Sequence, residues 1–183
     1  MFIQTETTPN PDAIKFIPGP PVVPGGSYDF RDAAAAERSP LAQRLFKIMG
    51  VSGVYLGGDF VSVTKGADDD WATLKPRILA AIMDHFLTGL PAVDAAAQPV
   101  AASSEEDSEI VQQIREIIDD RVRPAVAMDG GDIVFDRFED GIVYLHMRGA
   151  CAGCPSSSAT LKSGIENMLK HFIPEVQEVR PVL

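Results

Sequence analysis

Apolar residues in the second half of the chain recur every three or four positions in two separate stretches. The first stretch holds Ile110, Val111, Ile114, Ile117, Ile118 and Val122, and the second holds Leu161, Ile165, Met168, Leu169 and Phe172. This spacing puts the apolar side chains on one face of a helix, so it predicts two amphipathic helices. Pro124 is expected to end the first helix, because proline lacks the N–H that the helical backbone ladder needs.

Between these two helices the pattern changes to that of strands. IVFDRF and IVYLHMRG predict two strands joined by Glu139-Asp140-Gly141, and AMDGGD predicts a turn before them. The last residues, VQEVRPVL, predict a closing strand. The predicted order is therefore helix, strand, strand, helix, strand, which is a small layer of helices on an open sheet.

The first half of the chain mixes short strand-like runs with two helical patterns. MFIQTETT and AIKFIPG predict strands on either side of a turn at Pro9–Asp12, and VSGVYLGGDFVSVTK predicts a hairpin. Ser39 followed by Pro40 is typical of a helix start. A last helix carries on one face Leu74, Ile78, Ile82 and Phe86. We expect this helix to begin near Thr73, so that Pro76 lies in its first turn.

Between the two halves lies a stretch that has almost nothing to bury. Residues 92–107 read AVDAAAQPVAASSEED and consist mainly of Ala, Ser, Pro and acidic residues, a composition typical of flexible linkers. We therefore expect an N-terminal domain at residues 1–91, a linker at 92–107 and a C-terminal domain at 108–183. The predicted fold class is mixed α/β (α+β), with two small domains.

Composition and charge exclude several classes of function. The net charge of the 183 residues is −10 and basic residues are not clustered, which argues against nucleic-acid binding. No apolar run is long enough to span a bilayer, and two cysteines cannot form a disulfide scaffold. The first residues, MFIQTETTPNP, resemble neither a secretory signal nor a transit peptide. They favour the cytoplasm of a bacterium over the mitochondrial matrix.

Both cysteines of the chain, Cys151 and Cys154, lie in the sequence GACAGCPSSS. This stretch follows a predicted strand and precedes a predicted helix, with Pro155 suited to the first helical position and Cys154 to the N-cap. The positive end of the helix dipole would then favour the thiolate form, which binds metals and attacks as a nucleophile. The small residues around the sulfurs leave room for something large, either a cluster or a second copy of the same loop.

Four interpretations of this loop compete. The two thiols could be buried structural residues, although a glycine-rich loop makes a poor core. They could form a dithiol–disulfide oxidoreductase site, which would make the protein an enzyme. They could bind zinc, with His146 and His171 as the nearest further ligands; a local hydrogen bond explains each histidine better. They could hold an iron–sulfur cluster, which takes four cysteine thiolates.

The iron–sulfur interpretation carries a prediction about stoichiometry. One chain supplies two thiolates and a cluster takes four, so two chains are needed. The simplest arrangement is a homodimer with the cluster on its two-fold axis. A cluster held between subunits can be assembled and released without unfolding either chain, which suits a carrier.

At these residues the chain resembles the NifU-like (Nfu) family of iron–sulfur scaffold and carrier proteins. The resemblance covers RPAVAMDGGDIVF and VYLHMRGACAGCPSSSATLKSGIENMLKHFIPEVQEV, and MFIQTETTPNPDAIKFIPG and SPLAQRLFKIMGVSGVYLGGDFVSVTK resemble the N-terminal domain of one branch. It implies a non-enzymatic carrier of a [4Fe–4S] cluster, made of iron and sulfide. It also implies that Cys151 and Cys154 are the ligands and that the cluster bridges two subunits and passes to apo target proteins.

Two further features are interpreted more simply. Asp129-Gly-Gly-Asp132 could be a metal or partner site, but a turn in which glycine adopts positive φ explains it better. The N-terminal domain has no cysteine and a single histidine, His85, so it offers no chemical site. We therefore predict that it recognises client proteins or an upstream cluster scaffold, against the simpler view that it only stabilises or solubilises the carrier.

Overall fold

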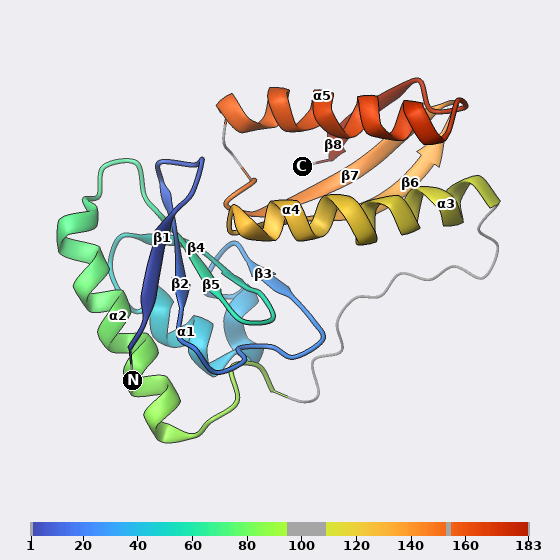
Figure 1. The fold of residues 1–183 in the computed structure, drawn as a ribbon. Helices are drawn as coiled ribbons and strands as arrows, with labels where there is room; N and C mark the ends of the chain where they lie inside the picture. The colour runs from blue at the N-terminus through green and yellow to red at the C-terminus, as the bar shows by residue number, and fades with distance from the viewer. Residues whose placement is uncertain (1, 95–108, 153–154, 183) are drawn as a thin grey trace. The chain divides into compact units, whose positions relative to one another are not determined.

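The computed structural model describes residues 2–94, 109–152 and 155–182 (Figure 1). It divides into two compact units, Met1–Ala101 and Ala102–Leu183. Each unit combines helices with a sheet, so the predicted mixed α/β (α+β) class with two domains is confirmed. Most of the predicted linker, residues 95–107, lies outside the described residues. Its first residues do not behave as a linker, because Ala92 is buried in the core of the N-terminal unit and the amide of Asp94 donates to the Arg38 carbonyl at 2.9 Å.

The N-terminal unit is built on one antiparallel sheet with strand order β1-β2-β5-β4-β3. Its elements in chain order are β1 (Gln4–Thr7), β2 (Ala13–Ile17), β3 (Tyr28–Phe30), a 3₁₀ turn (Ala35–Arg38), α1 (Pro40–Phe46), β4 (Val51–Leu56), β5 (Val61–Lys65) and α2 (Trp71–Thr88). The predicted strands and helices are present. The short edge strand β3 was not predicted, because it lies beside a proline- and glycine-rich stretch that looks like a loop.

Helices α1 and α2 pack their apolar faces onto this sheet. Leu41 and Leu45 of α1 and Ile78 and Ile82 of α2 are fully buried in one core with Phe16 of β2 and other strand residues. Burial of each such side chain contributes about 1.5–3 kcal/mol of transfer free energy. The core therefore fixes the two helices side by side.

The starts of both helices are tied to distant parts of the unit. The hydroxyl of Ser39 accepts a hydrogen bond from the Ala42 amide at 3.0 Å and donates one to the Ala92 carbonyl at 2.6 Å. Ser39 is thus the N-cap of α1, as predicted. At the start of α2, the indole N–H of Trp71 donates to the Pro11 carbonyl at 3.0 Å.

The predicted start of α2 near Thr73 is wrong. The helix begins at Trp71, with Asp70 as its N-cap, so Pro76 lies in its second turn. Only the first four N–H groups of a helix lack an intrahelical partner, and Pro76 comes after them. The helix therefore forgoes one backbone hydrogen bond at Pro76, and the buried contacts of Leu74 and Ile78 on either side keep it continuous.

The C-terminal unit follows the predicted order of helix, strand, strand, helix and strand. Its elements are α3 (Glu109–Ile117), a π-helical turn (Ile118–Val122), α4 (Arg123–Met128), β6 (Gly131–Glu139), β7 (Ile142–Gly149), α5 (Pro155–Phe172) and β8 (Glu178–Val182). The sheet order is β6-β7-β8, with β6 antiparallel and β8 parallel to β7. Positive φ angles of 50° at Asp140 and 78° at Gly141 form the predicted tight turn between β6 and β7.

The prediction that Pro124 ends the first helix is wrong. The helical chain continues through Pro124 to Met128. Directly before the proline, the amide of Arg123 donates to the carbonyl of Ile118, five residues back, which is the π-helical pattern. This wider turn shifts the hydrogen-bond register just where proline lacks its N–H, so the chain stays helical.

One face of the C-terminal sheet packs on the helices. Along β7, buried residues alternate with half-buried ones, so its side chains face the core at every second position. The core joins Ile114 and Ile118 of the first helix, Leu145 of β7, and Ile165 and Leu169 of α5. The loop that carries the cysteines connects the end of β7 to the start of α5.

Candidate functional site

Cys151 lies two residues beyond the end of β7, where the chain turns sharply. Gly149 has φ of 62°, a conformation that favours glycine, and the amide of Ala152 donates to the Gly149 carbonyl at 3.1 Å. Helix α5 begins at Pro155, the position predicted for it. The other predicted ligand, Cys154, lies outside the described residues.

The turn before β6 forms the support under Cys151. Gly131 pairs with Gly149 across the two strands, and the amide of Ala150 donates to the Gly130 carbonyl at 3.1 Å. A Cβ atom added to Gly131 would lie 2.2 Å from the Cys151 Sγ and 3.0 Å from the Arg148 carbonyl oxygen. The distance to the sulfur is sterically impossible, so the sulfur rests directly on the backbone of Gly131.

This contact adds a role to the Asp129–Asp132 segment. The predicted turn with positive φ is confirmed at Gly130, where φ is 75°. The second glycine, Gly131, is required by the close approach of the cysteine side chain. Sequence reasoning missed that contact. The available signal was a second consecutive glycine at the start of one strand, next to a strand that leads into the cysteine loop.

The Cys151 side chain is buried in the single chain. It is 5% exposed and belongs to the same apolar core as Met147 and Ile165. Burial of this kind agrees with the structural-thiol interpretation of Cys151. It agrees equally with a ligand that the fold keeps away from solvent oxidants until its loop engages a partner.

Asp132 makes a buried ion pair that explains its position. Its carboxylate is 5% exposed and accepts two hydrogen bonds from the Arg123 guanidinium, at 2.8 Å from Nε and 3.0 Å from Nη2. The hydrogen bonds to Asp132 raise the pKa of Arg123 above its usual range. The guanidinium also binds the exposed Asp119 at 3.2 Å. The ion pair of Asp132 therefore connects β6 to α4. This agrees with the interpretation of Asp129–Asp132 as a structural turn and not as a metal or partner site.

The two histidines considered as zinc ligands have local contacts instead. The Nε2 of His146 lies 3.2 Å from the Asp136 carboxylate on the neighbouring strand. The ring of His171 packs edge-on against Phe172, near the far end of α5 from the cysteine loop. This helix has 18 residues, which corresponds to about 27 Å. Within residues 2–94, 109–152 and 155–182, no group of three or more His, Cys, Asp or Glu side chains could hold a metal ion.

Comparisons with known proteins match both units. Residues 3–89 match the family described as scaffold protein Nfu/NifU N terminal, and residues 114–180 match the NifU-like domain. The human protein named NFU1 iron-sulfur cluster scaffold homolog, mitochondrial, is 53% identical over all of this chain, which spans 72% of the human protein. The Drosophila erecta protein of the same name is 50% identical over all of this chain, which spans 65% of it.

A solved structure also resembles part of the chain. The solution structure of a NifU-like protein from Saccharomyces cerevisiae has a TM-score of 0.47 and 25% identity, and the match covers 52% of this chain and 86% of that one.

The human and Drosophila relatives are named as scaffold proteins and not as enzymes, so the predicted non-enzymatic role is confirmed. The name of these relatives describes a scaffold and not a dithiol oxidoreductase.

The predicted bacterial cytoplasmic location is contradicted by these relatives, which are named as mitochondrial proteins. The prediction relied on the first residues of the chain. Residues 3–11 of that stretch contain β1 and fall within the matched N-terminal family region, so they belong to a folded domain. In the described residues, the helices are too short or too polar to cross a membrane.

Proposed function

This chain belongs to the Nfu/NifU family of scaffold proteins, and from that membership we propose that it carries an iron–sulfur cluster to apo proteins that need one. The carrier role follows from relatives that are named as iron–sulfur cluster scaffolds. In this proposal residues 108–183 hold the cluster, the N-terminal domain recognises clients or an upstream scaffold, and residues 95–107 link the two domains.

We propose that the cargo is a [4Fe–4S] cluster bound by Cys151 and Cys154 from each of two chains. The observation that supports this most directly is the incomplete ligand set. One chain contains two cysteines, and the described residues offer no group of further side chains that could complete a metal site. Four thiolates are available when two copies of the loop meet. A symmetric homodimer is the smallest assembly that supplies them.

Each part of the loop has a role in this proposal. Gly131 sets the position of the Cys151 sulfur, because the sulfur lies on its backbone. The start of α5 follows Cys154 directly, and the positive end of an 18-residue helix stabilises negative charge on a nearby thiolate. The ion pair of Asp132 with Arg123 fixes the start of β6, the strand whose first residue is Gly131. When the dimer separates, each chain keeps only two cysteine ligands. The cluster can then move to a recipient protein that offers more ligands than one chain does.

Cysteine substitution tests the ligand assignment. We expect anaerobic reconstitution of the full chain with iron and sulfide to give the broad visible absorbance of a thiolate-bound cluster, together with dimerisation. Cys151→Ala and Cys154→Ala should each abolish both. Ala152→Ser, in the same loop, is the control and should leave both intact. A cysteine variant that still binds a complete cluster would show that the assignment is wrong.

A further inference from the structure

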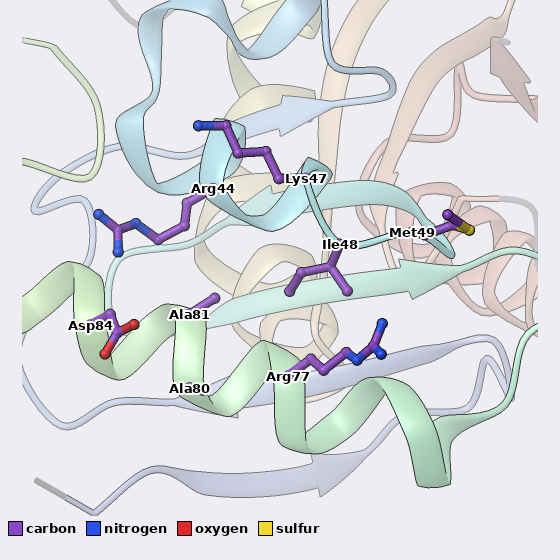
Figure 2. A pocket seen from close by; sticks show the side chains of 8 residues that line it. All are labelled: Arg44, Lys47, Ile48, Met49, Arg77, Ala80, Ala81 and Asp84. Atoms are coloured by element: carbon purple, nitrogen blue, oxygen red, sulfur yellow. The ribbon is translucent and has the colours of Figure 1, made fainter.

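The N-terminal unit has a groove between its two helices (Figure 2). Its volume is about 520 Å³, and its walls come from the end of α1, the turn that follows, and the middle of α2. The lining residues are Arg44, Lys47, Ile48, Met49, Arg77, Ala80, Ala81 and Asp84. Nothing in the proposed cluster chemistry uses this α1–α2 groove.

The α1–α2 groove carries positive charge in an acidic protein. Three of its lining residues, Arg44, Lys47 and Arg77, are basic and one, Asp84, is acidic, whereas the whole chain has a net charge of −10. Figure 2 shows Arg44 and Asp84 at one end of the groove and Arg77 extending along α2 below Ile48.

The three cations are not used by the fold itself. Other basic side chains are paired with carboxylates, for example Lys15 with Glu6 at 3.2 Å and Lys65 with Asp12 at 2.8 Å. In the described part of the chain, no ion pair involves a cation of the groove. Their charge is therefore available to a carboxylate from outside.

The floor and edges of the groove are apolar. Ala80 and Ala81 are small and sit on α2 between Arg77 and Asp84, so another chain can approach the helix backbone closely. Met49 is 87% exposed at one end. Met83 and Leu87 lie three and seven residues after Ala80 on α2, so they share its face of the helix. Their side chains are 37% and 75% exposed. These exposed apolar side chains are available for contact with a partner that lies along α2.

We propose that the α1–α2 groove binds an acidic amphipathic helix of a partner protein. Apolar side chains of that helix would pack on Ile48, Met49 and the two alanines, and its Glu or Asp side chains would pair with Arg44, Lys47 and Arg77. The proposal rests on the recognition role assigned to the N-terminal domain under the proposed function, and it names the chemistry of what is recognised.

A helix fits this surface better than other ligands. The walls of the groove are side chains from two helices and the turn after one of them, with no strand edge to which an extended peptide could add. Two helices with a small-residue floor between them accept a third by ridges-into-grooves packing. A long polyanion such as nucleic acid would be repelled by the charge of the rest of the chain.

The test uses the full-length chain without cluster and two synthetic peptides. Both peptides are amphipathic helices of about four turns with Leu and Ala on one face; one carries Glu beside that face and the other carries Lys. Binding is followed by amide chemical shifts at about 0.15 M salt. We expect the Glu peptide to shift amides of α1 and α2 selectively, and the Lys peptide to cause no shifts there.

Charge reversal on one helix provides the matched comparison. Arg77→Glu should weaken binding of the Glu peptide by about tenfold or more. Lys75→Glu makes the same charge change two residues away on α2, outside the lining residues, and should weaken binding far less. Both variants should take up cluster like the wild type. A wild-type chain that takes up no cluster would contradict the proposed function while leaving the groove result intact.

Three results would overturn the groove proposal. The first is absence of shifts in α1 and α2 with the Glu peptide. The second is equal binding of the Glu and Lys peptides, which would show that charge does not select the partner. The third is a response of these amides to inorganic phosphate without a response to the Glu peptide, which would make the groove a small-anion site.

Discussion

Gly131 is the residue whose replacement should report most directly on the support under the cysteine loop. A Cβ atom at this position would lie 2.2 Å from the Cys151 sulfur. Gly131→Ala should therefore push the sulfur away and lower the unfolding free energy of the C-terminal unit by about 1–3 kcal/mol, the usual cost of overpacking. Calorimetry measures the stability. Iodoacetamide alkylation in a Cys154→Ala background measures access to Cys151, which should increase.

Gly164→Ala is the matched control for this prediction. Gly164 lies within α5, and an added Cβ there meets no atom within 4 Å. Alanine should raise stability by up to about 1 kcal/mol, because it has the higher helix propensity, and it should leave alkylation of Cys151 unchanged. Gly131→Ala with wild-type stability and alkylation would mean that the sulfur does not rest on Gly131.

The two carboxylates bound by Arg123 should differ in importance. Asp132→Asn removes the charge opposite a partly buried guanidinium and should cost about 1–3 kcal/mol of unfolding free energy. Asp119 has a side chain that is 60% exposed, so Asp119→Asn should cost less than about 0.5 kcal/mol. Chemical denaturation followed by circular dichroism measures both. Equal costs would show that burial of the Asp132 pair is unimportant.

Single residues were predictable from the sequence where local chemistry decides their role. Ser39 as an N-cap and the positive φ of Gly130 follow from preferences of one residue for one backbone position. The contact of Gly131 with Cys151 depends on the pairing of two strands. The MDGGD pattern alone gives no distance between a glycine and a cysteine 20 positions later.

Helices were predicted well in their apolar faces and poorly at their prolines. The buried residues Ile114 and Ile118 and the buried residues Ile78 and Ile82 occupy the faces that their spacing predicts. Pro76 and Pro124, however, are both inside continuous helical segments. Packing of the flanking apolar residues outweighs the loss of one backbone hydrogen bond, and sequence periodicity does not report that balance.

His85 should make the stability of α2 depend on pH. The side chain is buried on the core face of the helix, and desolvation together with the nearby positive charge of Arg44 lowers its pKa. The unfolded chain therefore takes up a proton at higher pH than the folded chain does. The contribution of neutral His85 to folding stability is fully present above the pKa of histidine in the unfolded chain, about 6.5. This contribution should be lost as the pH drops below that value.

Trp71 provides the measurement for this prediction. It is the only tryptophan in the chain and lies at the start of α2, so its fluorescence follows unfolding of the N-terminal unit in urea. Lowering the pH from neutral to mildly acidic should destabilise the wild type more than His85→Leu. His171→Leu, in the other unit, should behave like the wild type. The same pH response in the wild type and in His85→Leu would refute a role for His85.

At the scale of the whole molecule, the two units have separate proposed tasks. The cysteine loop lies in the C-terminal unit and the α1–α2 groove in the N-terminal unit. A truncated chain starting at Ser104 should therefore still bind cluster. It should deliver cluster more slowly than the full chain to at least one of several unrelated apo proteins. Transfer rates from equal amounts of loaded protein measure this difference. Unchanged rates for every recipient would remove the recognition role.

The large-scale organisation was more predictable than the cellular location. The halves of the chain on either side of residues 92–107 predict different orders of helices and strands. Each half has enough apolar residues for a small core, so the two-domain fold class could be predicted. The location prediction failed because it relied on the lack of targeting features in MFIQTETTPNP, a stretch that contains β1 of the first sheet. How two cysteine loops would meet is a property of two chains, which periodicity within one chain cannot describe.

The central claim is that one cluster needs two chains. Native mass determination with iron and sulfide analysis of the anaerobically reconstituted full chain tests it most directly. We predict a dimer that contains one [4Fe–4S] cluster per pair of chains, and a monomer when the cluster is removed. A single chain that retains a complete cluster, or a protein that binds zinc without sulfide, would contradict the claim.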